Sequence, residues 1–502
     1  MFFGGEVFMK KNLLSWFLLI LSALMYGCAF IFSSLWWLTL IFLIPLLYLV
    51  IHRLGDSCEV LSYSEALVWS SVSMLLHLSG IGYSVMKSGP SAFCFQCMRL
   101  IPLVPIFCYV VFLSSTWLWL SARLIQIRVV CELGPVRIII FIEALALYFY
   151  AMVHWLMCVF GRCEGYTLID PMLPLARKPF FLYPMIVLDH FISLSLLVGF
   201  AALCAVTLYF FRHAQYKKML FVVCGSVGIV CLWMSLAFWM GQKIQAYDPS
   251  NVKKVVNRIV HCVGFFPVSK NTITDACEAM RDHFTKALAA HPTADIILTH
   301  ETVCRMDLLE YKQSCARAFA AQALGRPAHV LIGAFRWNGD MFHNTVYWFY
   351  DGVLKNFYDK RHAMAVEERL PWFLQNAFFK QVFFGKLEQI TPSKETRKVF
   401  KLSDDIVCVP YICSEFFFNK KPDEPQDIKA RRYTILAMCN DMWARAEFLK
   451  DLMALHARFK AIYWQRPVVY CAFCRGLFIT PAGEEYVLAQ YMFPDGPGYR
   501  TE

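Results

Sequence analysis

Charged side chains are scarce in this 502-residue chain. Asp, Glu, Lys and Arg together make up 17% of it, whereas they make up about a quarter of a typical soluble domain. Hydrophobic residues make up 58% and crowd into the first half, which excludes an ordinary soluble protein as a description of the whole chain. We therefore predict a membrane domain at 1–241, a linker at 242–250 and a globular domain at 251–502.

The second half also lacks a run of Lys and Arg interleaved with aromatic residues, the pattern typical of a nucleic-acid surface. The chain has a formal net charge of +11, but many of its cations flank apolar segments, as membrane topology requires. We expect no nucleic-acid partner.

The cysteines also do not form the pattern of a disulfide framework. Nine of the twenty cysteines follow residue 242, and an odd number leaves at least one of them unpaired within that half. The two Cys-x-x-Cys pairs, Cys94/Cys97 and Cys471/Cys474, lie far apart, and the second falls in a strand-like run. We expect neither a metal site nor a cofactor.

Long apolar runs fill the first half. A helix that crosses a bilayer needs about 20 apolar residues, and seven runs are predicted to cross: 13–31, 34–51, 65–85, 101–122, 138–160, 181–211 and 219–241. Cytoplasmic loops carry an excess of cations. Cations fall on alternate loops, at Lys10/Lys11, His52/Arg53, Arg123/Arg128/Arg137 and Arg212/Lys217/Lys218. This topology predicts a multi-pass membrane protein with its second half outside the cytoplasm; in a bacterium, that is an inner-membrane protein with its second half on the periplasmic side.

Four ionisable residues lie inside these runs: Glu143, His154, Asp189 and His190. Such residues can mark a polar pathway or a headgroup site, but a buried pair or a side chain at the end of a span explains them equally well. The sequence assigns them no role.

Strand-like and helix-like segments alternate in the second half. Strands are predicted in "VVNRIVHCVGFF", "ADIILTHE", "DIVCVPYI", "TILAMCND", "VVYCAF", "GLFITPAG" and "EYVLAQYMF", and helices at 273–291, 307–324 and 447–464. The runs "HVLIGAFRW" and "NTVYWFYDG" predict a hairpin that turns at Asn338-Gly339-Asp340. An α/β pattern that ends in strands predicts a layered α/β sandwich.

Three polar residues stand at the ends of these predicted strands. Glu301 ends "DIILTHE", Lys360 follows the hairpin in "FYDKRH", and Cys413 ends "DIVCVPYIC". Because the strand ends of one sheet lie on one edge, a carboxylate, an ammonium group and a thiol can converge there. Each also has an ordinary explanation: a helix cap for Glu301, a solvated Lys360 and a core Cys413. Cys408, five residues earlier on the same strand, should face the opposite way.

Short sequence words around these residues resemble, in the same order, motifs of the apolipoprotein N-acyltransferase family within the carbon–nitrogen hydrolase (nitrilase) superfamily. "DIILTHET" is similar to that family's strand ending in Pro-Glu-Thr, and "FHNTVYWF" to its Tyr-Asn-Ser/Thr strand. "FYDKRHAMAVEERLP" is similar to Tyr-x-Lys-x-His…Gly-Glu-x-x-Pro, "YICSEFFF" to Ile-Cys-Tyr-Glu-x-x-Phe, "CNDMW" to Ser-Asn-Asp-x-Trp, and "QRPVVYCAFCRGLFITPAG" to Arg-Pro…Gly…Asp-Pro-x-Gly. The resemblance covers Val252 to about Gly483 together with the multi-span half.

The resemblance implies a multi-span α-helical membrane domain followed by a nitrilase-like α-β-β-α sandwich. It implies an acyltransferase that moves a fatty acyl chain from a phospholipid to the N-terminal amine of a lipoprotein through a cysteine thioester. Glu301 would then be the general base, Lys360 the cation that holds the oxyanion, and Cys413 the nucleophile. The implied supporting residues are Glu368, which orients Lys360, its rival Glu367, and Glu415.

The chain also departs from that family. Ala365-Val366-Glu367 replaces Pro-Phe-Gly, Ser414 replaces the tyrosine after the nucleophile, and no run after Gly483 is long enough to span a membrane. The plan also resembles the TraB-type proteins of conjugal transfer systems. A second hypothesis is therefore a membrane protein that partners the conjugation machinery, with a nitrilase-like domain that serves assembly or binding. A third is a membrane-tethered amidase.

The segment 370–386, "LPWFLQNAFFKQVFFGK", combines aromatic residues with lysines. This combination suits an interfacial arm that enters the lipid headgroups, and an amphipathic core helix is the alternative. The residues predicted to face lipid are Trp372, Phe373, Phe378, Phe379, Phe383 and Phe384.

Overall fold

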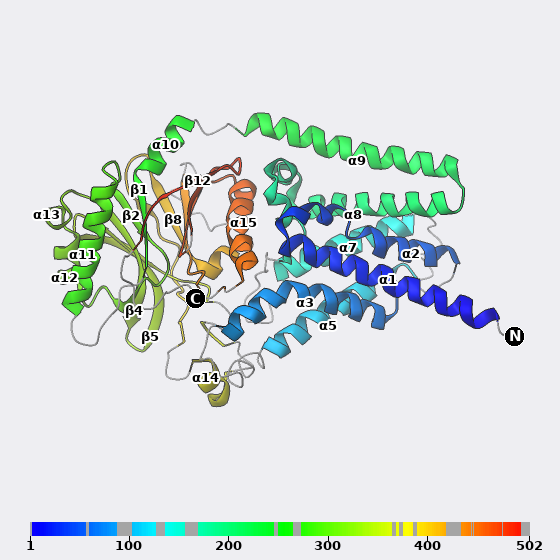
Figure 1. The fold of residues 1–502 in the computed structure, drawn as a ribbon, viewed down its shortest axis with the longest axis horizontal. Helices are drawn as coiled ribbons and strands as arrows, with labels where there is room; N and C mark the ends of the chain where they lie inside the picture. Colours follow the sequence, from blue (N-terminus) through cyan, green and yellow to red (C-terminus); the bar gives the residue numbers. More distant parts are fainter. Residues whose placement is uncertain are drawn as a thin grey trace. The chain divides into compact units, whose positions relative to one another are not determined.

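The computed structural model describes residues 3–56, 60–87, 103–126, 136–155, 169–244, 249–264, 273–363, 368–370, 375–384, 389–417, 433–442, 444, 446–473 and 475–492 (Figure 1). The chain divides into two compact units. The first comprises Met1–Lys243 and Ala444–His456, and the second comprises Ile244–Trp443 and Ala457–Glu502.

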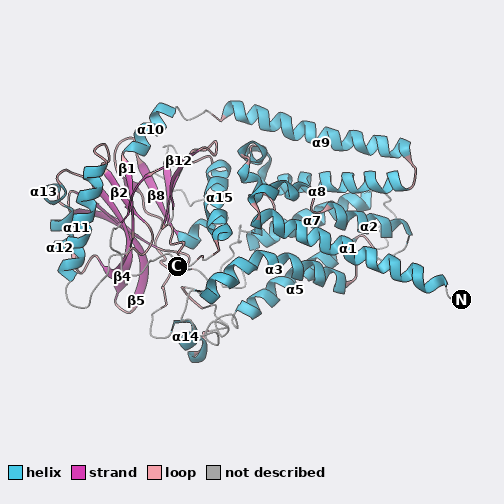
Figure 2. Ribbon diagram, viewed as in Figure 1, coloured by secondary structure: helices cyan, strands magenta, loops and turns pink. Residues whose placement is uncertain are grey.

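The described residues between 3 and 243 form helices and the turns between them (Figure 2). The α-helices are α1 (Phe3–Ile31), α2 (Ile44–Asp56), α3 (Tyr63–Lys87), α5 (Leu103–Leu124), α7 (Val136–Trp155), α8 (Met185–Arg212) and α9 (Tyr216–Lys243). Short 3-10 helices lie between them: η1 (Ser33–Leu40), η4 (Leu173–Arg177) and η5 (Pro179–Leu182).

Six helical stretches of the described residues are long and apolar enough to cross a membrane, by length and composition: Leu13–Ile31, Ser33–Leu54, Phe107–Leu124, Val136–His154, Met185–Arg212 and Tyr216–Lys243. They match six of the seven predicted spans. The seventh predicted span, 65–85, lies within the helix α3, which is not among these six stretches. Several polar side chains of α3 are buried, among them Glu65, Ser70 and His77. Glu65 is held by Arg53 at 2.6 Å, so part of α3 packs through polar contacts.

The second unit contains two β-sheets and the helices that cover them. Its strands are β1 (Ile259–Val263), β2 (Ile296–Thr299), β3 (Cys304–Asp307), β4 (His329–Asn338), β5 (Met341–Tyr350), β6 (Val353–Asp359), β7 (Phe400–Lys401), β8 (Val407–Ile412), β9 (Thr434–Met438), β10 (Val468–Ala472), β11 (Arg475–Ile479), β12 (Glu485–Val487) and β13 (Ala489–Met492). Its helices are α10 (Pro249–Asn257), α11 (Ile273–Ala290), α12 (Lys312–Phe319), α13 (Ala321–Leu324), α14 (Ala377–Phe384) and η7 (Cys413–Phe417), and α15 (Glu447–Trp464) crosses the division between the units.

The first sheet has the strand order β13-β1-β2-β4-β5-β6, with β3 paired to β4, and the second has the order β12-β11-β10-β9-β8-β7. The central strands β1, β8 and β10 are buried along their whole length, as expected for parallel strands covered on both faces. Helices α11 and α12 share one hydrophobic core with the first sheet. On the second sheet, Trp464 of α15 packs against Tyr411 of β8. The second unit is therefore a layered α/β sandwich.

Three local expectations need correction. The helix predicted at 307–324 is two helices, because Ala320 adopts an extended conformation between α12 and α13. The strand predicted at 485–493 is divided into β12 and β13, which pair with β11 and β1 in different sheets. Between them the buried Leu488 donates its N–H to the carbonyl oxygen of Gly476. The segment "VVNRIVHCVGFF" starts in α10 and enters β1 only at Ile259.

Candidate active site

Glu301 lies in the tight turn that follows β2. The next residue, Thr302, has a φ of +53°, a left-handed conformation that is uncommon for a residue other than glycine. Gly333 of β4 makes room for this turn. A Cβ atom on Gly333 would lie 2.5 Å from the carbonyl oxygen of His300 and 2.9 Å from the Cα atom of Glu301. Glycine at 333 thus lets the backbone that carries Glu301 approach the sheet closely.

Glu301 is only 4% exposed. Protein groups donate hydrogen bonds to both of its carboxylate oxygens. Its Oε1 accepts from Nζ of Lys360 at 3.1 Å and from Nδ2 of Asn344 at 2.6 Å. Its Oε2 accepts from the backbone N–H of Asn440 at 2.9 Å. Burial raises the pKa of the Glu301 carboxyl, the Lys360 ammonium opposes that rise, and the neighbouring Glu368 adds to it. The net upward shift makes Glu301 a stronger base than an exposed glutamate.

Lys360 follows β6 and is fully buried. Its backbone N–H donates to the carbonyl oxygen of Asn344 on β5, and its Nζ also lies 2.8 Å from Oε1 of Glu368. Burial acts to lower the pKa of Lys360, but Glu301 and Glu368 together hold that pKa well above its usual range. A permanent cation therefore stands between two carboxylates.

Cys413 follows β8 as the first residue of η7. Its φ is +45°, a strained value for a non-glycine residue, of a kind that often marks a functional position. Its thiol is hydrogen-bonded to Cys439 and to the Glu301 carboxylate, and it lies within electrostatic range of Lys360. The hydrogen bond with Cys439, burial and the charge of Glu301 raise the pKa of Cys413 well above its usual range, and Lys360 opposes the rise. The resting site therefore holds a protonated thiol beside a base and a cation.

Glu415 fastens the turn of Cys413 to the end of β6. Its Oε2 accepts from the backbone N–H of Ile412 at 2.8 Å, and its Oε1 accepts from the Tyr358 hydroxyl at 2.7 Å and from the backbone N–H of Arg361 at 2.6 Å. Burial acts to raise the pKa of Glu415, but Arg397 and these donors outweigh burial and lower it. Glu415 holds the thiol and Lys360 in a fixed relation without touching either.

The structure brings Glu301, Lys360, Cys413 and Glu368 together and places Glu415 behind them. Glu367, Trp372 and Phe373 lie outside the described residues, as do Cys94, Cys97 and Cys474. The remaining aromatic residues of the predicted arm lie in α14, where Phe378 is 69% exposed. Cys408, the cysteine five residues before Cys413, is buried within β8, and burial raises its pKa to about 12.

Sequence analysis missed the roles of three residues: Asn344, Asn440 and Cys439. Asn344 lies on β5 and donates to Glu301 and, at 3.2 Å, to Oε1 of Glu368. Its own Oδ1 is buried and has no hydrogen-bond partner among the described residues, so it can accept a donor from a bound molecule. The words "FHNTVYWF" and "CNDMW" contain the three residues, but only the pairing of distant strands shows what they touch.

The ionisable residues of the first unit form hydrogen-bonded groups of their own. Nε2 of His190 lies 3.0 Å from Oδ2 of Asp170, and its Nδ1 lies 2.9 Å from Nε2 of His154. Glu143 accepts a hydrogen bond from Ser195 at 3.0 Å. Asp189 has a φ of +65° near the start of α8. Of these residues, His190 and Asp170 are buried, whereas Glu143 and Asp189 are exposed.

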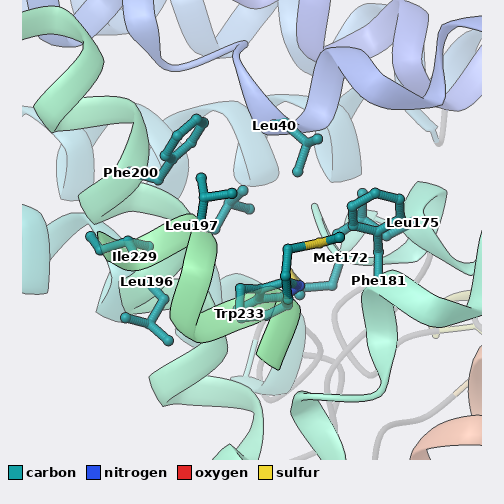
Figure 3. A pocket seen from close by; sticks show the side chains of 11 residues that line it. Leu40, Met172, Leu175, Phe181, Leu196, Leu197, Phe200, Ile229 and Trp233 are labelled. Carbon is teal, nitrogen blue, oxygen red and sulfur yellow. The ribbon is translucent and has the colours of Figure 1, made fainter. Parts of the chain in front are cut away.

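A cavity of ≈ 140 Å³ lies among η1, η4, η5, α8 and α9 (Figure 3). Only apolar side chains line it, including Phe200, Trp233 and Met172. It offers no group for acid–base or nucleophilic chemistry. Among the residues that the structure describes, no group of three or more His, Cys, Asp or Glu side chains is arranged to hold a metal ion.

No protein-family model and no curated protein matches this chain. Solved structures that match it include a carbon–nitrogen hydrolase from Helicobacter pylori G27, at 13% identity over 45% of this chain and 82% of that one, with a TM-score of 0.32. A CN-hydrolase superfamily protein from Xanthomonas campestris matches at 17% identity over 41% and 78% of the two chains, with a TM-score of 0.27. Saccharomyces cerevisiae Nit3, of the nitrilase superfamily, matches at 13% identity over 46% and 84%, with a TM-score of 0.30. Likeness at this level says nothing of substrate, so the chemistry of this chain rests on its own residues.

Proposed function

We propose that this chain is a membrane-bound acyltransferase of the carbon–nitrogen hydrolase type. In this proposal it moves a fatty acyl chain from a phospholipid to the N-terminal amine of a lipoprotein through a thioester on Cys413. The observation that carries the proposal is the buried contact of the Cys413 thiol with the Glu301 carboxylate, beside the ammonium group of Lys360. A thiol, a base and a fixed cation in contact are the parts that nucleophilic acyl transfer needs.

In the first half of the reaction, Glu301 takes the proton of the Cys413 thiol, and the thiolate attacks the carbonyl carbon of the phospholipid ester. Lys360 stabilises the negative charge that develops on the carbonyl oxygen. The ester C–O bond then breaks, and Glu301 gives its proton to the departing lysophospholipid oxygen. The acyl chain remains on Cys413 as a thioester.

In the second half, the acceptor amine attacks the thioester while Glu301 takes one of its protons. The buried Oδ1 of Asn344 lies beside this base and would accept a second N–H of the amine. The C–S bond breaks, and Glu301 returns the proton to the Cys413 thiolate. The products are an amide and the restored thiol.

A lipid donor fits the rest of the chain. Among the residues that the structure describes, six helical stretches are apolar enough to span a bilayer, and the exposed Phe378 of α14 lies near Lys380 in sequence. We propose that 370–386 dips into the headgroup region and that the α/β unit lies on the periplasmic side of a bacterial inner membrane. The two other hypotheses, a membrane-tethered amidase and a conjugation protein of the TraB type, are outcomes of the test below.

The test is to trap the acyl-enzyme. The purified full chain in detergent is incubated with a phospholipid radiolabelled in its ester-linked acyl chain, without an amine acceptor. We expect a labelled adduct that hydroxylamine releases and that Cys413→Ala abolishes. Lys360→Ala should slow its formation by about 10²–10³-fold, because one oxyanion donor is lost. Glu301→Gln should block it, and Cys408→Ala should leave it unchanged.

Two other results would replace the proposal. If no phospholipid labels Cys413 but simple amides are hydrolysed, the protein is an amidase. If neither reaction occurs and Cys413→Ala still supports conjugal DNA transfer, the α/β unit serves binding or assembly.

A further inference from the structure

The candidate nucleophile has a second thiol beside it that the acyl-transfer scheme does not use. We propose that Cys439 is a resolving thiol, so that oxidation of Cys413 by a hydroperoxide ends in a Cys413–Cys439 disulfide that thiols can reverse. The site would then be one of reversible oxidative modification. This inference rests on the geometry of the thiol pair and holds whichever substrate Cys413 attacks.

The pairing of two parallel strands places the thiols side by side. In the register of β8 and β9, Ile412 pairs with Met438 at the ends of both strands, and Cys413 and Cys439 are the residues that directly follow these ends. Neighbouring strands lie about 4.8 Å apart, and the Cα atoms of a disulfide usually lie about 4.4–6.8 Å apart. The Cys439 side chain also lies close enough to the Cys413 thiol to raise its pKa. Closing the bond therefore needs a small movement of side chains rather than of strands.

The position of Cys439 is fixed from both sides. Its backbone N–H donates to the carbonyl oxygen of Cys471 on β10 at 2.8 Å, and the next residue, Asn440, donates its N–H to Glu301. Cys439 is fully buried and Cys413 is 4% exposed. A sulfenic acid on Cys413 would meet the neighbouring thiol before it met a thiol from solution.

Other cysteines near the site are less suited to this role. In the β9–β10 register, Cys471 pairs with Met438 rather than with Cys439. Cys471 lies within β10, one strand further from β8, whereas Cys439 directly follows β9, which is the neighbour of β8. Cys408 lies near the other end of β8, five positions before Cys413.

The chemistry balances with one equivalent of hydrogen peroxide. The Cys413 sulfur attacks the O–O bond, one oxygen becomes the S–OH of a sulfenic acid, and the other leaves as water. The Cys439 sulfur then attacks the sulfenic sulfur, the S–S bond forms, and the S–OH oxygen leaves as a second water. The two thiols lose two electrons and two protons in total, and the peroxide is reduced to two waters. Glu301 can carry the Cys413 proton in the first step.

The experiment follows Cys413 by mass spectrometry in the purified full chain in detergent. The protein is treated with hydrogen peroxide, quenched with catalase, unfolded, alkylated and digested. In wild type we expect a peptide cross-linked through Cys413 and Cys439, loss of Cys413 alkylation, and recovery of that alkylation after dithiothreitol. A second pair, Cys277 and Cys315, has its Sγ atoms 3.7 Å apart in α11 and α12 and reports whether peroxide has reached buried thiols.

Two variants separate the proposal from a general effect of oxidation. Cys439→Ser should form no such cross-link, and peroxide should then carry Cys413 to sulfinic acid, which dithiothreitol does not reverse. Cys471→Ser is the matched control and should behave like wild type. Cys439→Ala, with the melting temperature of each variant, shows whether a loss comes from misfolding.

The proposal is overturned if Cys413 in wild type goes to sulfinic acid without the cross-link, or if Cys439→Ser recovers with dithiothreitol as fully as wild type. Oxidation of Cys277 and Cys315 that leaves Cys413 untouched would overturn it too. None of these readouts involves an acyl donor, so failure of the acyl-transfer proposal would leave this result unchanged.

Discussion

Nζ of Lys360 lies 3.1 Å from Oε1 of Glu301, and neither side chain is more than 5% exposed. An ion pair taken out of water is costly unless further partners satisfy it. Glu368 and Asn344 supply those partners and close a ring of contacts around the pair. The ring fixes a cation and a base beside Cys413, and its electrostatic effects can be measured without knowing the substrate.

The electrostatic effect of this ring on Cys413 can be tested by measuring the pH at which the thiol becomes reactive. The pKa of Cys413 is raised well above its usual range by the hydrogen bond with Cys439, by burial and by Glu301, while Lys360 opposes the rise. The midpoint of iodoacetamide alkylation of Cys413 should therefore lie above the value of about 8.5 for a free thiol. Lys360→Met should move it to higher pH, because the thiolate loses its cation, and Cys439→Ala should move it to lower pH.

Quantitative mass spectrometry of the Cys413 peptide across a pH series gives these midpoints, with a melting curve for each variant as the folding control. A midpoint that falls on Lys360→Met substitution would contradict the placement of the ammonium group beside the thiol.

Although Gly333 is far in sequence from Glu301, we expect its substitution to disturb the active site. In Gly333→Ala the new methyl group would meet the backbone of His300 and Glu301 at 2.5–2.9 Å, so the turn that carries the base must move. We expect a loss of stability of about 1–3 kcal/mol, as for other overpacked positions, and a larger loss of acyl-adduct formation than that instability explains.

Gly339→Ala is the control for this change. Gly339 has a φ of +60° with open space around it, so the variant strains the hairpin turn and leaves the Glu301 turn in place. We expect Gly339→Ala to lose as much stability as Gly333→Ala but to form the acyl adduct normally. Chemical denaturation measures the stability, and the labelling assay measures the adduct. Normal adduct formation by Gly333→Ala would contradict the claim that Gly333 positions the turn that carries Glu301.

Glu415→Gln should destabilise the α/β unit. The change removes a buried charge that faces Arg397 at 3.5 Å, and breaking a buried ion pair costs about 3–5 kcal/mol. Because the folded-state pKa of Glu415 is lowered, its contribution is present above the unfolded-state value of about 4.3 and is lost as pH falls through the lower folded-state value. Denaturation curves at several pH values should show the two proteins converge on acidification, and a constant difference would argue against this role.

Membrane topology is open to a direct check. The alternating loop cations predict that the C-terminus lies outside the cytoplasm, which requires that α3 crosses the membrane despite its buried polar residues. A fluorescent reporter that matures only in the cytoplasm, fused after Glu502, should stay dark. A reporter fused after Gly55, at a predicted cytoplasmic loop, should be bright. A bright signal from the C-terminal fusion would reject the seven-span topology.

The sequence by itself determined the features that depend on local pattern. Apolar runs of sufficient length indicated six of the helical stretches, and β-rich runs located most strands and the residues Glu301, Lys360 and Cys413 at their ends. Strand periodicity and apolar length are properties of neighbouring residues, so one chain shows them without its fold. The run at 65–85 likewise forms a helix, α3, some of whose polar residues, such as Glu65, are buried.

Only the tertiary structure decided which distant residues meet. Glu301 touches Asn344 on β5, Lys360 just after β6 and Asn440 just after β9, and these strands belong to two sheets. The pairing of β8 with β9 places Cys439 beside Cys413, and Leu488 lets the chain cross from one sheet to the other. Such contacts depend on strand order and register across more than a hundred residues, and these follow from the packing of whole layers rather than from any local word in the sequence.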